Sequence, residues 1–294
     1  MTSPNPLIPE LDGRRISVDA AIQNPTVLRN RIGKLTAEWI ILDKFFTPLG
    51  ERVAGRALVY SVPSYSDLFT TPIEERTPGA EYRSVGASEP EPRMVHVGDR
   101  GGWFEIDDTL RRNTVAGADY LDSESRQLSN RIAASLDESA MAAIAGSDIA
   151  SVAILGNWSA LKTVGPLDQL TESADLPTAH LSQAVLEFDL ERMGIKPDLM
   201  IVNPTQHHEL RVAFGDRLGD VLASIGLHIF AHMLVPENTV YVVQRGQVGV
   251  VAFDQPLTVS VTRFEERRTT RVTAFVEPAF AVTRPFAAKK LVLA

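Results

Sequence analysis

The chain has 294 residues, with 29 basic and 37 acidic side chains and a formal net charge of −8 at pH 7. It contains no cysteine, which excludes disulfide frameworks, thiolate metal sites and cysteine nucleophiles. The acidic balance argues against a surface that coats nucleic acid, because phosphate binding depends on clustered positive charge. The longest uncharged stretch, residues 221–236, is shorter than the about 20 residues that a membrane span requires. A hydrophobic content of 44% is typical of a folded, non-membrane protein.

The N-terminal region is predicted to be an extended arm followed by a short helix. Residues 1–28 are polar, lack periodicity and are interrupted by four prolines. From Val27 to Phe46 apolar residues recur at nearly helical spacing, until Pro48 and Gly50 stop the pattern. We expect the arm to be held by another surface, because it has too few apolar residues to bury itself.

The next region predicts a long, exposed β-hairpin. Strand-like runs occur at residues 57–62, 79–85, 93–97 and 103–106, and five prolines interrupt the region. With about 15 residues in each arm, such a hairpin would extend roughly 50 Å, further than the radius of a compact domain of this length. A hairpin of that kind is only marginally stable alone, so we expect it to lie on a neighbouring surface.

The clearest helical pattern in the chain covers residues 119–145. Asp122 and Arg126 are four positions apart on its polar face, and Gly146 lies where a helix end is expected. The apolar face is formed by Leu121, Leu128, Ile132, Leu136 and Met141. At 1.5 Å per residue the helix would be a rod about 40 Å long.

The second half of the chain predicts a mixed unit of helices and strands, followed by strands alone. An amphipathic helix over residues 178–193, capped by Thr178 and closed by Gly194, precedes a strand at 198–202. Asn203 and Pro204 then predict the start of a helix that runs to residue 214. Further strands are predicted at 240–243, 248–253, 257–264, 270–276 and 279–283. The charged turn 265–268 separates two alternating runs, which is a hairpin pattern.

The sequence offers little evidence of catalytic chemistry. It lacks the phosphate-binding loop, the dinucleotide-binding glycine motif and the nucleophile elbow. His207, His208 and Glu209 are consecutive, so on a helix their side chains would diverge by about 100°. His228 and His232 have better spacing for one ion but lie in an apolar run. We interpret the pairs Asp107–Asp108 and Glu74–Glu75 as solvated loop charges, and we predict no catalytic residue, metal or cofactor.

The chain resembles the major capsid proteins of tailed bacteriophages, which have the Hong Kong 97-like fold. The resemblance covers about residues 35–293 and rests on the order of four stretches. Gly101-Gly102-Trp103-Phe104-Glu105-Ile106-Asp107-Asp108 leads into the long helix, and Pro197-Asp198-Leu199-Met200-Ile201-Val202-Asn203-Pro204 opens another helix. The third stretch combines residues 234–243, Gly246 and 248–251, and the fourth combines 272–278 with 281–285.

The resemblance implies an α+β chain with four parts. Residues 1–50 would be the N-terminal arm, 51–98 the E-loop, 99–149 and 253–294 the peripheral domain with its long spine helix, and 150–252 the axial domain. Copies of the chain would assemble in the host cytoplasm as pentamers and hexamers of the icosahedral capsid of the virion. That capsid would enclose double-stranded DNA without sequence-specific binding, and its further partners would be separate scaffolding, portal and cement proteins.

The resemblance also suggests which residues contact neighbouring subunits. Glu74, Glu75 and Arg76 fall near the expected tip of the E-loop. The second expected contact is the charged turn of Glu265, Glu266, Arg267 and Arg268. Some family members link an E-loop lysine covalently to a late asparagine. This sequence has no lysine in residues 51–100 and no asparagine after Asn238, so we expect no such link.

Two other functions remain open at this stage. An encapsulin, a cellular compartment shell of the same fold, would enclose an enzyme instead of a genome. A metal-dependent enzyme would use His207 and His208, or the pair His228 and His232.

Overall fold

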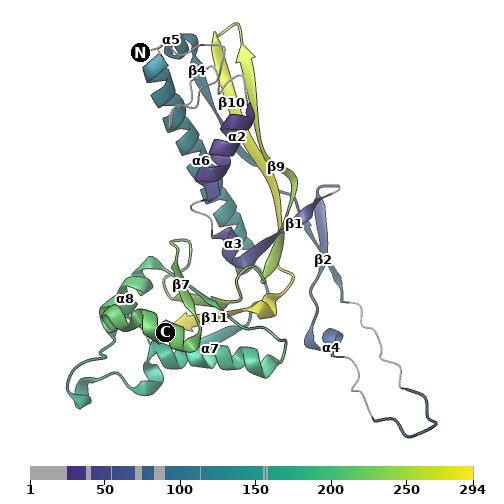
Figure 1. Ribbon diagram of the computed structural model, residues 1–294, viewed down its shortest axis with the longest axis vertical. Coiled ribbons are helices and arrows are strands. Elements are labelled where there is room, and N and C mark those ends of the chain that lie inside the picture. The colour runs from purple at the N-terminus through teal and green to yellow at the C-terminus, as the bar shows by residue number, and fades with distance from the viewer. Residues whose placement is uncertain are drawn as a thin grey trace, which may run out of the picture.

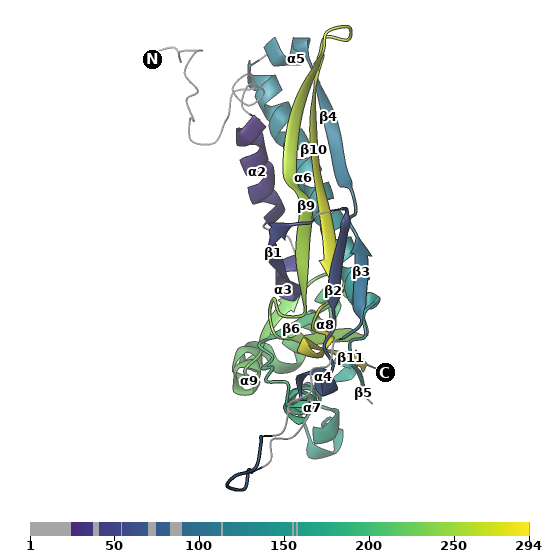
Figure 2. The same cartoon turned by 90° about the vertical axis from the view of Figure 1, so that its right-hand side faces the viewer.

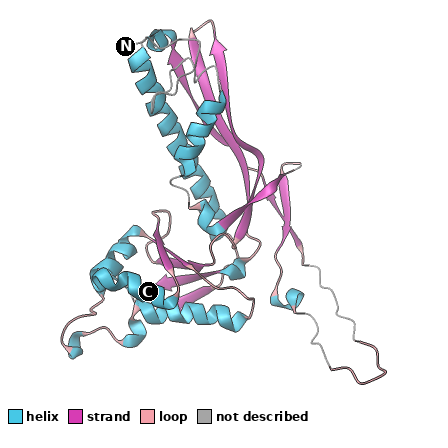
Figure 3. Cartoon of the chain, in the orientation of Figure 1, coloured by secondary structure: helices cyan, strands magenta, loops and turns pink. Residues whose placement is uncertain are grey.

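The computed structural model describes residues 25–37, 41–53, 55–69, 75–82, 90–112, 114–154, 156 and 158–293. Figure 1 shows three parts: an elongated unit built on a long helix, a compact unit below it, and a segment that projects from one flank. We call the projecting part, from residue 55 to residue 98, the hairpin segment. Helices and strands are mixed in both units, as Figure 3 shows, which confirms the predicted α+β class.

The elongated unit consists of a four-stranded sheet covered on one face by two helices. The strand order is β1 (Phe46–Arg52), β9 (Gly249–Phe264), β10 (Thr269–Ala281) and β4 (Arg100–Asp107). Helices α2 (Pro25–Ala37) and α6 (Thr114–Ala145) lie beside this sheet, and the short helices α3 (Leu42–Phe45) and α5 (Asp108–Arg112) lie near its two ends (Figure 2). β9 and β10 are antiparallel around the turn 265–268, which confirms the predicted hairpin.

Helix α6 confirms the strongest pattern in the sequence. It has 32 residues and is therefore about 48 Å long. Four of the five predicted apolar residues are buried, and Leu128 packs against the same core partly buried. Asp122 and Arg126 form an ion pair of 3.8 Å, and the helix ends just before Gly146.

The compact unit is a five-stranded sheet with helices around it. The strand order is β5 (Ser151–Ile154), β11 (Ala288–Leu293), β8 (Thr239–Val243), β6 (Leu199–Val202) and β7 (His228–Ala231). Its helices are α7 (Pro177–Glu191), α8 (Pro204–Phe214) and α9 (Leu218–Ile225). Short 3₁₀ turns connect these elements at Trp158–Ala160, Leu167–Gln169, Ser173–Asp175, Gly215–Arg217 and Pro285–Ala287.

The sequence predicted a capping residue for each of the two longer helices of the compact unit, and only one of these predictions is confirmed. Asn203 caps α8 as predicted, because its side chain accepts a hydrogen bond from the backbone N–H of Thr205. The predicted cap of α7 at Thr178 is wrong. That helix begins at Pro177, which occupies the first helical position, after Leu176.

A buried polar pair lies in the compact unit. The indole Nε1 of Trp158 donates a hydrogen bond of 3.1 Å to Nδ1 of His180, and both side chains are almost completely buried. Burial lowers the pKa of His180, and the accepted hydrogen bond requires an unprotonated Nδ1. His180 is therefore a neutral core residue at pH 7.

Several predicted elements differ from the structure. Within the helix predicted for residues 27–46, the described residues form α2 up to Ala37 and α3 at Leu42–Phe45. Residues 46–52 form β1, which pairs with β9 in parallel. The strands predicted at 248–253 and 257–264 are one strand, β9, and those predicted at 270–276 and 279–283 are joined as β10 up to Ala281. Residues 288–293, for which no strand was predicted, form β11 in the compact unit.

The hairpin segment is a true hairpin, but a much shorter one than predicted. Its paired strands, β2 (Ala57–Ser61) and β3 (Pro92–His96), have five residues each. Between them lies the short helix α4 (Tyr65–Leu68). The strand predicted at 79–85 is wrong for residues 79–82, which are not in a strand, and residues 83–85 lie outside the described residues. Of the predicted arm, residues 1–24 and 38–40 also lie outside them.

The sequence predicts no membrane span. No helix in the described part of the chain combines the length and the apolar composition that a bilayer crossing requires.

Candidate assembly interfaces

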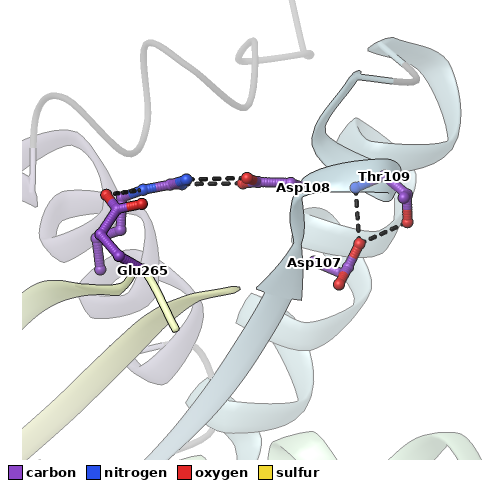
Figure 4. Close-up of polar contacts among 5 residues, drawn as sticks. Asp107, Asp108, Thr109 and Glu265 are labelled. Atoms are coloured by element: carbon purple, nitrogen blue, oxygen red, sulfur yellow. Dashed lines mark hydrogen bonds and ion pairs between the residues drawn. The ribbon is translucent and has the colours of Figure 1, made fainter. Parts of the chain in front are cut away.

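The charged turn between β9 and β10 is fixed to the end of β4. The guanidinium group of Arg263 donates two hydrogen bonds of 2.9 Å to the two carboxylate oxygens of Asp108. Its Nε donates a third, of 2.6 Å, to Glu265. Figure 4 shows Glu265 and Asp108 on opposite sides of this guanidinium group. These carboxylates raise the pKa of Arg263 further above its usual value.

The backbone at the same corner adds two further contacts. The amide of Asp108 donates to the carbonyl of Arg268, and Asp107 accepts hydrogen bonds from the amide and the hydroxyl of Thr109 (Figure 4). The Thr109 donors lower the pKa of Asp107. Asp107 and Asp108 are therefore not charges without partners, because both carboxylates accept hydrogen bonds at this corner, although these bonds lie at the surface.

The four charged residues of the turn divide into two groups. Glu265 is engaged within its own subunit by Arg263. Glu266, Arg267 and Arg268 are exposed, and within the described part of the chain their side chains make no hydrogen bond or ion pair. These three side chains are the ones that remain available for a neighbour.

The second predicted contact lies in the loop of the hairpin segment. Arg76 donates a hydrogen bond of 3.0 Å to the carbonyl of Ala80, and its guanidinium group lies 4.6 Å from the centre of the Tyr82 ring. Tyr82 is 78% exposed, and Glu75 is also exposed. Glu74 lies outside the described residues.

The hairpin segment also exposes apolar side chains that the sequence analysis did not select. Val59 and Met94 face each other across β2 and β3, and both are more than half exposed. Tyr65 and Phe69 stack with ring centres 4.7 Å apart and are half exposed. Cross-strand apolar pairs stabilise a sheet when a partner covers them, so this surface is suited to burial against another protein. The alternation of side chains along the strands at 57–61 and 92–96 is the sequence pattern that could have identified Val59 and Met94.

The histidines considered as metal ligands do not form a site. His228 and His232 lie at the start and just beyond the end of β7, so about 13 Å of extended backbone separates them. His207, His208 and Glu209 lie on α8, where burial and Arg211 lower the pKa of His207. Among the described residues there is no group of three or more histidine or acidic side chains that could hold a metal ion.

His232 instead belongs to a junction between the two units. Its Nε2 lies 3.6 Å from Oδ2 of Asp137 on α6, and its Nδ1 accepts a hydrogen bond from the amide of Leu234. The other oxygen of Asp137 accepts a bond of 2.9 Å from the amide of Ile41. Asp137 is 3% exposed, so this buried carboxylate joins the long helix, the start of α3 and the turn after β7. The sequence did not single out Asp137, because it falls among the polar residues that the helical pattern assigns to the solvent-facing side.

An ion pair with a buried lysine lies in the compact unit. Lys289 on β11 is 2% exposed, and its ammonium group is bonded to Oε1 of Glu191, at the end of α7. Its Nζ also lies 5.5 Å from the centre of the Phe188 ring. Nothing in the sequence around Lys289 and Lys290 predicts that one of these two lysines is buried.

Comparisons with known proteins agree with this architecture. The family model described as "Phage capsid protein" matches residues 90–291. No curated protein is detectably related to the chain by sequence.

Solved structures share the fold at low sequence identity. The capsid of cyanophage P-SCSP1u has a TM-score of 0.63 at 16% identity, with 87% of this chain and 88% of that chain covered. A virus-like particle from Pyrococcus furiosus has a TM-score of 0.59 at 14% identity, with coverage of 90% and 97%. The capsid of Myoviridae phage XM1 has a TM-score of 0.54 at 10% identity, with coverage of 86% and 91%.

The family match decides between the alternatives that the sequence left open. It covers more than half of the chain and describes phage capsid proteins, so the encapsulin alternative is not favoured. The chain belongs to the phage capsid protein family and is a major capsid protein with the Hong Kong 97-like fold.

Proposed function

We propose that this chain forms pentamers and hexamers of an icosahedral shell that encloses the double-stranded DNA of a tailed phage. Its place in the virion capsid, in a shell of many copies of itself, follows from the family. The projecting hairpin segment carries the proposal, because its exposed apolar side chains have no cover within their own subunit. In a shell of many copies, neighbouring subunits supply that cover.

The three parts of the molecule correspond to the parts of a Hong Kong 97-like subunit. We assign residues 1–50 to the arm and 51–98 to the E-loop. The elongated unit would be the peripheral domain, formed by 99–149 and 253–287. The compact unit would be the axial domain, formed by 150–252 together with β11. This assignment changes the domain division expected from the sequence only at the last strand.

The remaining parts of the proposal concern partners and chemistry. The net charge of −8 suits a wall that does not bind the genome, so DNA would be enclosed without sequence-specific contacts. Scaffolding, portal and cement functions would belong to separate proteins, and assembly would occur in the host cytoplasm. The chain would perform no catalytic step and require no cofactor.

Negative-stain microscopy of the expressed protein tests self-assembly. We expect closed particles of uniform diameter, because the uncovered apolar surfaces of the hairpin segment are buried only between copies. A protein that sediments as a stable monomer at all concentrations would contradict the proposal. Particles that contain a cargo enzyme would support the encapsulin alternative instead.

The exposed turn between β9 and β10 makes a second prediction for the same assay. We expect the double charge reversal Arg267→Glu/Arg268→Glu to lower the yield of particles several-fold. Each exposed ion pair contributes under about 1 kcal/mol, but a shell repeats the lost contact in every subunit. The matched control is Glu265→Gln, which changes a residue engaged inside the subunit and should leave the yield nearly unchanged. An unchanged yield for the double reversal would show that the turn is merely solvated.

A further inference from the structure

We propose that a groove at the junction of the two units binds a small aliphatic amine, with the ammonium group on Asp137 and the carbon chain against α6 and the turn after β7. The inference goes beyond the proposed function, because shell assembly requires no such ligand. Three observations carry it: the apolar lining of the groove, its uncompensated negative charge, and a buried carboxylate that faces it with one oxygen lacking a hydrogen bond.

The groove lies between α6 and the turn that follows β7, and we call it the α6 groove. Its volume is about 510 Å³, which is within the roughly 300–1,000 Å³ of small-molecule sites. Its lining is mainly apolar, with Ala133 and Ala134 on α6 and Met233 and Leu234 on the turn. Met233 is 79% exposed, so this wall is open to a ligand from solution. Such a lining suits the hydrocarbon part of a ligand.

The charged part of the lining is acidic. It consists of Asp137, Glu138 and His232. Glu138 is exposed and forms no ion pair with any described residue. Two carboxylates outweigh one imidazole, so the lining keeps a net negative charge in either protonation state of His232. An uncompensated charge of this sign attracts cations and repels anions.

Asp137 supplies the position for the ammonium group. Its side chain is 3% exposed yet lines the groove. Oδ1 accepts the hydrogen bond from the amide of Ile41. Oδ2 lies 3.6 Å from Nε2 of His232, which is beyond hydrogen-bond distance, and no other described residue donates to it. A buried carboxylate oxygen without a donor is costly, so an N–H donor brought by a ligand would form a short, charge-assisted hydrogen bond there.

The surroundings of Asp137 favour an organic cation over a metal ion. A hard metal cation requires several oxygen ligands. Among the described residues no group of three or more histidine or acidic side chains could hold one. An ammonium group has three N–H donors, which match Oδ2 of Asp137, the carboxylate of Glu138 and water at the open side of the groove. A primary aliphatic amine therefore satisfies both the acidic and the apolar lining.

A second groove is the principal competitor for such a ligand. It has a volume of about 550 Å³ and lies between the root of the hairpin segment and the end of α7. Its charges balance within the subunit, because Arg93 pairs with Asp148 and Lys289 pairs with Glu191. A cation would gain little from a balanced lining, so charge favours the α6 groove.

Titration calorimetry on unassembled full-length subunits tests the proposal, with hexylamine as the probe. Hexanol has the same carbon chain without the charge. We expect hexylamine to bind saturably, with one molecule per subunit, at least about ten times more tightly than hexanol. Asp137→Asn should weaken hexylamine binding about tenfold, because it removes the buried charge and keeps an acceptor for the amide of Ile41. Glu138→Gln should weaken it only about threefold, because that pair would be exposed.

Three matched variants locate the site. Ala134→Trp fills the α6 groove at an exposed position and should abolish the binding of both probes. Leu190→Trp fills the second groove, also at an exposed position, and should leave both affinities unchanged. Glu124→Gln removes a carboxylate elsewhere on α6 and should have no effect.

The contrary outcomes are equally definite. Absence of saturable hexylamine binding, equal affinities for hexylamine and hexanol, or amine binding that survives Ala134→Trp would each overturn the proposal. If Asp137→Asn does not fold, the comparison of the two probes on the unaltered chain, together with Ala134→Trp, decides the question. Absence of amine binding combined with loss of particles in Ala134→Trp would assign the groove to a neighbouring copy. The shell proposal is judged separately, by particle formation of the unaltered chain.

Discussion

We expect Gly249→Ala to lower the stability of the subunit by about 3 kcal/mol, at the upper end of the effect of overfilling a packed site. Gly249 begins β9, next to Phe46 of β1 and to the last residue of β10, Ala281. A β-carbon at this position would lie 2.7 Å from a ring carbon of Phe46 and even closer to the carbonyl oxygen of Ala281. Neither neighbour can move freely, because Phe46 is buried against Phe280 and the carbonyl belongs to the sheet.

Urea unfolding of unassembled subunits measures this effect. The matched control is Gly50→Ala, a glycine of β1 whose added β-carbon would meet no atom within 4 Å. We expect the control to change the midpoint little, as is usual for surface substitutions. Equal midpoints for both variants would show that β1 does not pack against β9 and β10 as described.

The pairing of β1 also shows which part of the fold the sequence could not reveal. Pro48 and Gly50 discourage both helix and strand, so the local pattern indicated only the end of a helix. The strand exists because β9, some 200 positions later, offers it a parallel edge. α6 was predictable from residue 119 onward for the opposite reason, since residues 119–145 repeat one apolar period, whereas its first turn from Thr114 was not predicted.

The candidate contacts, like the fold, could be predicted only in part from the sequence. The charged turn 265–268 and the loop around Arg76 were identified from their composition and order along the chain. The engagement of Glu265 within its subunit was not, because it depends on Arg263 being held by Asp108, 155 positions away. Distant pairing of this kind leaves no local signal, so sequence reasoning overestimated the number of free charges at the turn.

The pair of Lys289 and Glu191 leads to the second large effect. We expect Lys289→Met to lower the stability by about 3 kcal/mol, the lower end of the range for breaking a buried ion pair, because a third of the Glu191 side chain remains accessible to water. Methionine preserves the apolar stem that packs near Phe188, so the loss would reflect the missing ammonium group. Glu191 would keep one buried oxygen without a partner and would lose the partner of the other.

Two further variants, measured in the same urea assay, test whether the loss of stability comes from the missing ion pair. Lys290→Met changes the next residue of β11, which is less buried, and should cost under about 0.5 kcal/mol. The double variant Glu191→Gln/Lys289→Met removes both charges, so it should be more stable than Lys289→Met alone. If the double variant were less stable than that single variant, the carboxylate would not depend on Lys289. The position of β11 in the compact unit would then rest on its apolar neighbours and its pairing with β5 and β8 alone.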